Sequence, residues 1–240
     1  MATKLAFAYE WPRPAVTVDL IIFTVAGELQ DLRLQVLLIQ RDLEPFRGSW
    51  ALPGGFVREN EDLADAAARE LDEETGVHDV PLEQVETVGT PGRDPRGHVI
   101  TVVYVGLVAA DRHHLAASGD ARKASWFDVA GPGALPKLPF DHARLLEMGL
   151  AHLRGRIAES PVCFDLLPAQ FTFSELQALY EAILIHPLDR RNFRRKVLEL
   201  GLIAPAKGAR RVGRHRPAQL YRFVPRQFSK QAGRGRDLPF

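Results

Sequence analysis

The sequence predicts an α+β fold in two domains, residues 1–158 and 159–240. Strand-like apolar segments dominate the first part, whereas two amphipathic helices and a short hairpin dominate the second. The charge divides at nearly the same place: residues 1–160 hold 16 basic and 24 acidic side chains, and residues 161–240 hold 15 basic and 6 acidic ones. Opposite net charges in two parts of one chain indicate modules with different partners.

The first domain has the pattern of a sheet with helices. Apolar runs predict strands at 16–25 and 32–41, and the polar turn between them predicts a hairpin. Helical periodicity covers residues 61–74 and ends just before Gly76, a residue that favours helix C-termini. The same signals predict two later strands and a helix, at 98–110, 123–129 and about 141–158.

The second domain has the outline of a winged helix-turn-helix. Residues 160–170 hold two prolines and predict a linker. Thr172, with Glu175 three residues later, is a capping box that predicts a helix start. Asp189 predicts the start of a second helix and Gly201 its end. The apolar face of this second helix comprises Phe193, Val197, Leu198 and Leu200. A basic hairpin after two helices completes the winged-helix pattern.

Composition excludes several classes of protein. The chain is 46% apolar and 25% charged, as in globular proteins, and no apolar run approaches the roughly 18–20 residues that span a bilayer. The N-terminus lacks the pattern of a signal peptide, so we expect a cytoplasmic location and no membrane partner. Cys163 is the only cysteine, which excludes an intrachain disulfide and a cysteine zinc cluster.

Three glutamates, Glu70, Glu73 and Glu74, share one face of the predicted helix at positions i, i+3 and i+4. Stacked like charges repel, so a positive group must compensate for them. Oxygen ligands on one face suit a hard cation such as Mg²⁺ or Mn²⁺. Arg69 is placed to orient a glutamate through a charged hydrogen bond. An acidic helix face exposed to solvent is the alternative explanation.

The residues around this helix resemble the Nudix box. Gly55, Glu61 and the segment "RELDEETGV" at 69–77 occupy every fixed position of that motif at the required spacing. The resemblance is to Nudix hydrolases, which cleave nucleoside diphosphates linked to another group. It implies a mixed sheet sandwiched between helices and metal-assisted hydrolysis of a pyrophosphate. It also implies that the catalytic residues are Glu70, Glu73, Glu74 and Arg69, and that the metal ligands are Glu61, Glu70, Glu73 and Glu74.

Two further segments indicate a ligand. The segment "RDPRGHVITVVY" at 93–104 resembles one in Nudix proteins that handle ADP-ribose, and its two arginines suit bidentate phosphate binding. The segment 44–50 places Phe46 and Trp50 where an adenine can stack, with core packing as the alternative role. The predicted ligand-binding residues are Arg47, Trp50, Gly54, Gly55, Arg58, Arg93 and Arg96.

Basic side chains gather on the two elements that a winged helix offers to DNA. In a major groove, arginine binds guanine and Asn192 binds adenine bidentately, while the wing tip suits phosphates or a minor groove. A solubilising tail, or a patch that attracts RNA or a membrane, is the alternative. The predicted DNA-binding residues are Arg190, Arg191, Asn192, Arg194, Arg195, Lys196, Lys207, Arg210, Arg211, Arg214, His215 and Arg216.

The segments 171–203 and 215–223 resemble the C-terminal module of the Nudix-related transcriptional regulators of NAD metabolism in bacteria, the NrtR family. The resemblance implies a homodimeric repressor of NAD biosynthesis or salvage genes in the bacterial cytoplasm. ADP-ribose, or a related nucleotide, would bind the Nudix module and release double-stranded operator DNA. Many members have degenerate Nudix boxes, whereas this box is complete. A Mg²⁺-dependent ADP-ribose pyrophosphatase and a Nudix enzyme acting on RNA ends therefore remain the alternatives.

Overall fold

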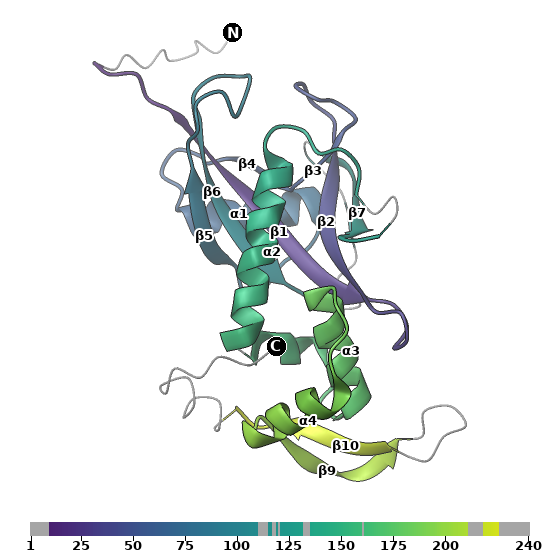
Figure 1. Cartoon of the computed structure of the whole chain (residues 1–240). Helices are drawn as coiled ribbons and strands as arrows, with labels where there is room; N and C mark the ends of the chain where they lie inside the picture. Colours follow the sequence, from purple (N-terminus) through teal and green to yellow (C-terminus); the bar gives the residue numbers. More distant parts are fainter. Residues whose placement is uncertain are drawn as a thin grey trace.

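The computed structural model describes residues 10–109, 115–116, 119, 121–131, 135–159, 161–210 and 218–225. They form two parts stacked end to end, a sheet flanked by helices and a smaller winged helix (Figure 1). This is the α+β fold that the sequence predicts. Among the described helices, none is long and apolar enough to cross a membrane.

The first part is a mixed sheet, in the order β3-β2-β1-β6-β5, with β4 also paired to β1 and β7 to β2. β1 and β6 run parallel, whereas the other pairs are antiparallel. The strands are β1 (Ala15–Ala26), β2 (Arg33–Arg41), β3 (Trp50–Ala51), β4 (Gly54–Phe56), β5 (Glu83–Val88), β6 (Val99–Leu107) and β7 (Ala121–Asp128). The helices are α1 (Leu63–Thr75) and α2 (His142–Glu159).

Alternation along β1 divides its buried side chains between two apolar cores, because successive residues of a strand point to opposite faces. Leu20 and Ile22 pack in the core under α1, whereas Ile21 and Phe23 pack in the core under α2. α2 lies close against β1 at Gly149, where a Cβ atom would sit 2.6 Å from Cδ1 of Ile21. The sheet is therefore covered on both faces.

The second part is a winged helix whose helix starts match the expected caps. Glu175 N–H donates to Oγ1 of Thr172 at 3.2 Å, and Thr172 N–H donates to the Glu175 carboxylate at 2.6 Å. The Asp189 carboxylate accepts the N–H of Asn192 at 2.8 Å. The elements are β8 (Phe171–Thr172), α3 (Phe173–Leu184), α4 (Arg190–Glu199), β9 (Ile203–Arg210) and β10 (Ala218–Phe223), with the strand order β8-β10-β9.

The segment that the sequence predicts as a linker contributes to the apolar core that the two parts share. Residues Pro161–Leu166 form a 3-10 helix, η2, with Cys163 fully buried against Tyr180 and Phe164 stacked on Phe223 at 4.4 Å between ring centroids. One apolar core runs from β1 and α2 through η2 to α3 and α4. The sheet and the winged helix are consequently held together by buried side chains.

Thr172→Ala tests the capping box. We expect it to lower the free energy of unfolding by about 1–2 kcal/mol, because the Glu175 N–H loses its acceptor at the helix start. Urea denaturation followed by circular dichroism measures the loss. Ser174→Ala, an exposed change in the same first turn, is the matched control and should stay within about 0.5 kcal/mol of the parent. Equal losses in both variants would contradict the capping role.

Candidate functional site

Arg69 binds three of the glutamates that the sequence placed in one site. Its guanidinium forms a bidentate ion pair with Glu61, with N···O distances of 2.6 and 2.9 Å. It also donates to Glu70 at 2.6 Å and to Glu73 at 3.3 Å. Arg58 donates to both oxygens of Glu73, at 3.1 and 3.2 Å. The positive charge that the stacked carboxylates require is therefore supplied by two arginines.

The acidic side chains differ in their ionisation. Hydrogen bonds from the Arg69 side chain and the Arg58 backbone lower the pKa of Glu61 to about 2. Burial raises the pKa of Glu70, and the hydrogen bond from Arg69 opposes this rise only in part. Glu74 is buried and accepts the N–H of Gly54 at 2.8 Å. Glu61 is thus held as an anion, whereas burial favours the protonated form of Glu70.

The two glycines before α1 let the chain fold tightly around these carboxylates. Gly54 has a φ of +150°, and a Cβ atom there would clash with the backbone oxygen of Val18. A Cβ atom on Gly55 would clash with the Glu70 carboxylate. Only glycine fits both positions without displacing β1 or Glu70.

The four glutamates of this site, Glu61, Glu70, Glu73 and Glu74, are chemically suited to bind a hard cation. Their side chains are not arranged around a common point as metal ligands would be. Carboxylate oxygens are the ligands that Mg²⁺ and Mn²⁺ prefer. Within the described ranges, no three His, Cys, Asp or Glu side chains are grouped as metal ligands. Instead, oxygens of Glu61, Glu70 and Glu73 accept hydrogen bonds from Arg69 and Arg58.

A cavity of about 400 Å³ opens beside the acidic helix, between β1, β2, β4 and the start of α2. Of the predicted ligand and metal residues, those that line it are Gly54, Gly55, Arg58, Glu70, Glu74, Arg93 and Arg96. Three further predicted residues do not line the cavity. Glu73 contacts the lining residue Arg58, Arg69 contacts the lining residue Glu70, and Glu61 pairs with Arg69. Arg47 and Trp50 are not among the residues that line it. Arg47 pairs with Asp42 instead, and Trp50 packs edge-on against Phe127 at 4.8 Å.

The floor of the cavity is a buried ionic network that the sequence did not predict. Arg93 donates to Asp141 at 2.8 and 3.0 Å and to Asp19 at 3.2 Å, with its own side chain 5% exposed. Burial alone would lower the pKa of Arg93, but the two aspartates raise it. Arg93, expected to bind phosphate, therefore already pairs with two protein carboxylates through Nε and Nη2.

His142 completes the network from the first turn of α2. Its Nδ1 accepts the N–H of Leu52 at 3.0 Å, and its Nε2 lies 3.5 Å from Asp19. Burial lowers the pKa of His142. The imidazole is therefore neutral, with its proton on Nε2 facing Asp19. The one sequence signal for this network is Asp19 itself, a charged residue inside the apolar segment "VTVDLIIFTV".

Aromatic rings and guanidinium groups surround the mouth of the cavity. The Arg96 guanidinium lies 4.8 Å from the ring centroid of Phe56 and 5.7 Å from that of Phe140, and pairs with Asp94 at 2.6 Å. Arg41 lies 5.1 Å from Phe140 on another side. Such rings offer stacking surfaces, and the guanidinium groups attract anions. The mouth therefore suits a ligand that combines an aromatic base with phosphates.

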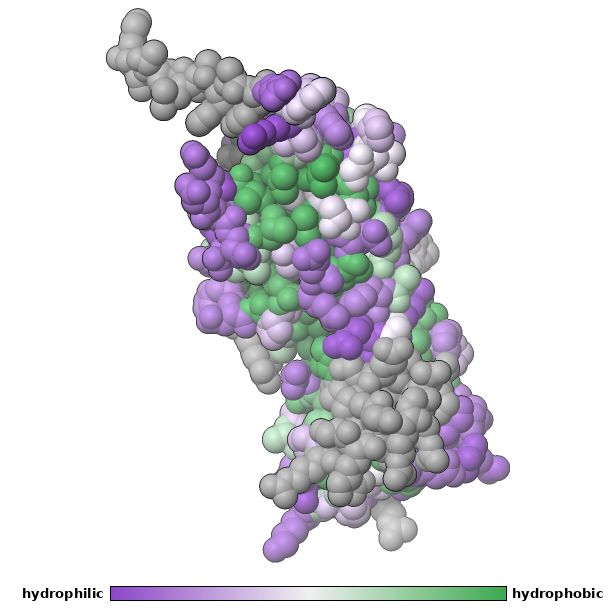
Figure 2. Space-filling model, turned by 90° about the vertical axis from the view of Figure 1, so that its left-hand side faces the viewer, coloured by the Kyte–Doolittle hydropathy of each residue, from purple (hydrophilic) through white to green (hydrophobic). Residues whose placement is uncertain are grey.

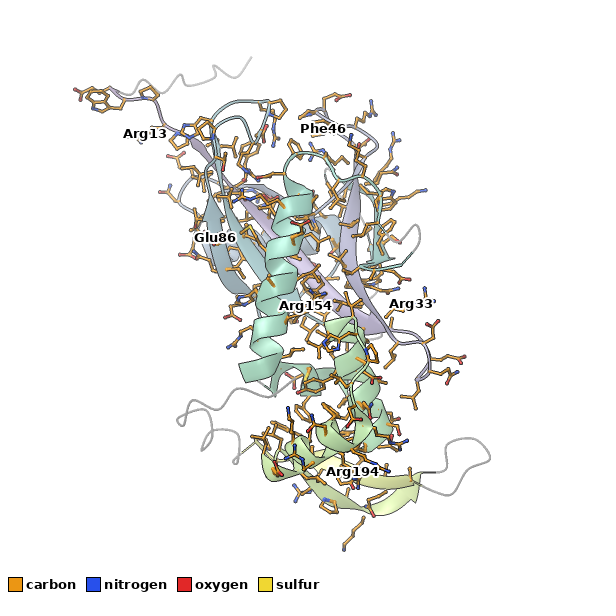
Figure 3. The ribbon with its side chains drawn as sticks, viewed as in Figure 1. Arg13, Arg33, Phe46, Glu86, Arg154 and Arg194 are labelled. Carbon is orange, nitrogen blue, oxygen red and sulfur yellow. The ribbon has the colours of Figure 1, made fainter. Side chains whose placement is uncertain are left out.

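The recognition-helix candidates on α4 separate into two sets. Arg190, Arg191, Asn192 and Arg195 are exposed on the side away from the core. Arg194 is turned toward the wing, where it donates to the Tyr221 hydroxyl at 2.8 Å (Figure 3). It also lies 5.0 Å from the ring centroid of Phe173. Arg194 thus joins α4 to β10 and α3.

The remaining candidates lie on or beyond β9. Lys207 is exposed on that strand, Lys196 is half-buried on α4, and Arg210 is the last residue of β9. Leu198, which the sequence assigned to the apolar face of the helix, is 42% exposed. Only Phe193, Val197 and Leu200 of that set are buried. Four candidates lie outside the described residues: Arg211, Arg214, His215 and Arg216.

Two protein-family models match the chain. The NUDIX domain matches residues 13–148, and the NrtR DNA-binding winged helix domain matches residues 163–223. The chain is 38% identical to the "ADPR responsive transcriptional repressor NtrR" of Acinetobacter baylyi, over 90% of this chain and 84% of that protein. It is 40% identical to the "ADP-ribose pyrophosphatase" of Methanocaldococcus jannaschii, over 56% of this chain and 72% of that protein.

Solved structures of Shewanella oneidensis NrtR are similar over both parts. The complex with a 27mer DNA superposes with a TM-score of 0.70 at 35% identity, covering 89% of this chain and 95% of that one. The structure of its NUDIX domain with ADP ribose has a TM-score of 0.53 at 36% identity, covering 60% of this chain and 90% of that one.

Arg93→Met tests the buried network. We expect it to lower the free energy of unfolding by about 3–5 kcal/mol, because Asp19 and Asp141 lose their partner in a buried position. Arg33→Met is the matched control, since Arg33 pairs with aspartates at the surface and its side chain is 54% exposed. We expect a loss within about 1 kcal/mol there. Chemical denaturation measures both, and similar losses would show that the network contributes no more than surface pairs.

Proposed function

The chain belongs to the NrtR family, which joins a Nudix domain to a winged helix, and on this premise we propose that it is a transcriptional repressor whose DNA binding responds to ADP-ribose. The observation that carries the proposal is that the similarity to the Acinetobacter repressor extends over both modules. The Shewanella relative was crystallised with DNA, and its Nudix domain with ADP ribose. Both ligands suit the chemistry of this chain.

The cavity mouth supports a dinucleotide-like effector. A pyrophosphate needs positive charge, and Arg41, Arg58 and Arg96 line the cavity. An adenine needs a flat apolar surface, and Phe56 and Phe140 supply two rings. Arg96 already contacts both rings, so an incoming base would compete with its guanidinium. ADP-ribose contains both of the groups that this mouth suits.

Effector and DNA would bind at opposite ends of the molecule. Phe46, which packs on Phe140 of the cavity mouth, lies at one end of Figure 3, and Arg194 on α4 lies at the other. α2 begins at the cavity with His142 and leads into η2 at the junction with the winged helix (Figure 1). Any effect of ADP-ribose on DNA binding is therefore allosteric, and linkage requires that DNA weaken ADP-ribose binding by the same factor.

A homodimer acting on NAD biosynthesis or salvage genes is part of the proposal. A small groove of about 170 Å³ between β5, β6 and α2 is lined mainly by apolar residues. Figure 2 shows apolar residues gathered over the sheet domain on this side. Apolar surface of this kind supports contact with a second copy of the chain.

Hydrolysis of ADP-ribose is the second candidate function. The complete Nudix box and the 40% identity to a pyrophosphatase favour it. Glu61, Glu70 and Glu73 would hold Mg²⁺ or Mn²⁺ in place of their contacts with Arg69 and Arg58, and Glu74 would be the fourth ligand. A bound divalent ion supplies charge neutralisation and activation of water in such a site. Glu74 and Gly54 would keep the loop before α1 in position during the reaction.

Mobility-shift and anisotropy measurements with duplex DNA from promoters of NAD genes test the repressor proposal. We expect the full-length protein to bind with a steep salt dependence, and saturating ADP-ribose to weaken binding by about 5–150-fold. Arg191→Ala should reduce the slope of log K against log salt by about 0.9, as loss of one phosphate contact does. Arg33→Ala, an exposed arginine on the other domain, is the matched control and should leave the slope unchanged.

Two results would contradict the repressor proposal. Unchanged DNA affinity at saturating ADP-ribose would remove the sensor role. Equal affinities and equal salt slopes in the parent and in Arg191→Ala would remove Arg191 from the DNA interface.

Glu73→Gln tests hydrolysis. If the chain is a pyrophosphatase, the parent releases AMP from ADP-ribose with Mg²⁺, and Glu73→Gln loses at least about 100-fold in rate while still binding DNA. Asp72→Asn, an exposed carboxylate next in sequence, is the matched control and should retain the rate. Chromatography of the products measures AMP. A parent that releases none in Mg²⁺ or Mn²⁺ is a sensor only, and equal rates in Glu73→Gln would place the activity elsewhere.

A further inference from the structure

Leu198 is an apolar side chain on a surface that is otherwise polar. It lies near the end of α4 and is 42% exposed, although leucine is usually buried. The buried side of the same helix is already formed by Phe193 at 3% and Val197 at 2% exposure. Leu198 therefore lies on the side of α4 that does not pack into the winged helix.

The helical repeat places Leu198 beside the exposed arginines. Residues three, four and seven positions apart share one face of an α-helix. Leu198 follows Arg195 by three positions and Arg191 by seven, and both arginines are exposed. The outward face of α4 thus combines positive charge with one apolar side chain. This is the face that a winged helix inserts into a major groove.

Hydrogen bonds within this face restrict what its polar groups can recognise. Arg195 donates to Oδ1 of Asn192 at 2.7 Å and to the Glu199 carboxylate at 3.2 and 3.4 Å. With one lone pair of its oxygen engaged, the Asn192 amide offers mainly N–H donors outward. Donors match the acceptor atoms O6 and N7 of guanine, N7 of adenine and O4 of thymine. None of these polar groups recognises the methyl group of thymine, which requires an apolar side chain.

We propose that Leu198 is a specificity-determining residue that contacts the C5-methyl group of a thymine in the major groove of the operator. The inference rests on the proposed function, because it requires that α4 bind DNA. Thymine is the one base of DNA that presents a methyl group in the major groove, and apolar side chains recognise it there. The arginines around Leu198 bring the negatively charged duplex against this face, which removes the leucine from water.

Thymine-to-deoxyuridine substitution tests the contact, because it removes only the methyl group. The probe is a duplex enriched from a random-sequence library by the full-length protein. Each thymine is replaced singly by deoxyuridine, and fluorescence anisotropy gives the affinity of the parent and of Leu198→Ala. We expect at least one position per half-site where deoxyuridine weakens parent binding about fourfold, as expected for one buried methyl group. Leu198→Ala should bind the thymine and deoxyuridine duplexes equally at that position.

Ile185→Ala is the matched control variant. Ile185 is 39% exposed on the same winged helix but lies at the C-terminal end of α3. It should keep the fourfold preference for thymine. Leu198→Ala should also keep the salt slope of the parent, since leucine contacts no phosphate.

Three outcomes would overturn the inference. In the first, Leu198→Ala retains the thymine preference of the parent at every position. In the second, Leu198→Ala weakens all duplexes equally and changes the mass in sedimentation, which would assign Leu198 to contact with a second copy of the chain. In the third, the parent enriches no duplex, which would remove the proposed function together with this inference. The first two leave the proposed function intact.

Discussion

The apolar contact among α2, η2 and α3 determines how the two parts of the chain are arranged. Cys163 and Tyr180 are buried at this junction, and the core continues from β1 to the recognition helix without a gap. Separating the parts would expose these side chains to water, at about 25 cal/mol for each Å² of apolar surface. Linked domains that share such a core move together more readily than apart. The cavity and α4 are consequently parts of one body.

Electrostatic pairing has a comparable role inside the sheet domain. Carboxylates of the Nudix box form ion pairs with Arg69 and Arg58, and Arg93 forms ion pairs with Asp19 and Asp141. A cation that entered the acidic site would have to compete with the Arg69 guanidinium, whose nitrogens lie 2.6 Å from oxygens of Glu61 and Glu70. The same residues can thus support either a metal site or a rigid wall for a nucleotide. Whether these residues form a metal site or a wall for a nucleotide depends on how strongly a cation binds the carboxylates relative to the guanidinium groups.

Local patterns in the sequence predicted most of the framework. The hairpin of β1 and β2, the helix ending at Gly76 and the capping box at Thr172 all follow from spacing or cap chemistry within a few residues. β5 was missed because "EQVETV" is a mostly polar edge strand, and β3, β4 and β8 are only two or three residues long. The sequence predicts only a linker at 161–166, because the burial of this segment depends on α3 and β10, which come later in the chain. Contacts between segments that are far apart in the sequence cannot be predicted from local patterns.

The candidate sites likewise divide into residues that local patterns predict and contacts that only the structure shows. Motif spacing predicts the acidic and the basic candidates, whereas the partners of Arg93 lie 74 and 48 positions away in the sequence. Arg194 and Arg195 are identical neighbours, yet only the structure shows that the first is bound to Tyr221 of β10. This bond has a geometric consequence. Because a side chain ties α4 to β10, the protein itself fixes the distance between this helix and the wing strand, and a duplex that contacts both would have to match that distance.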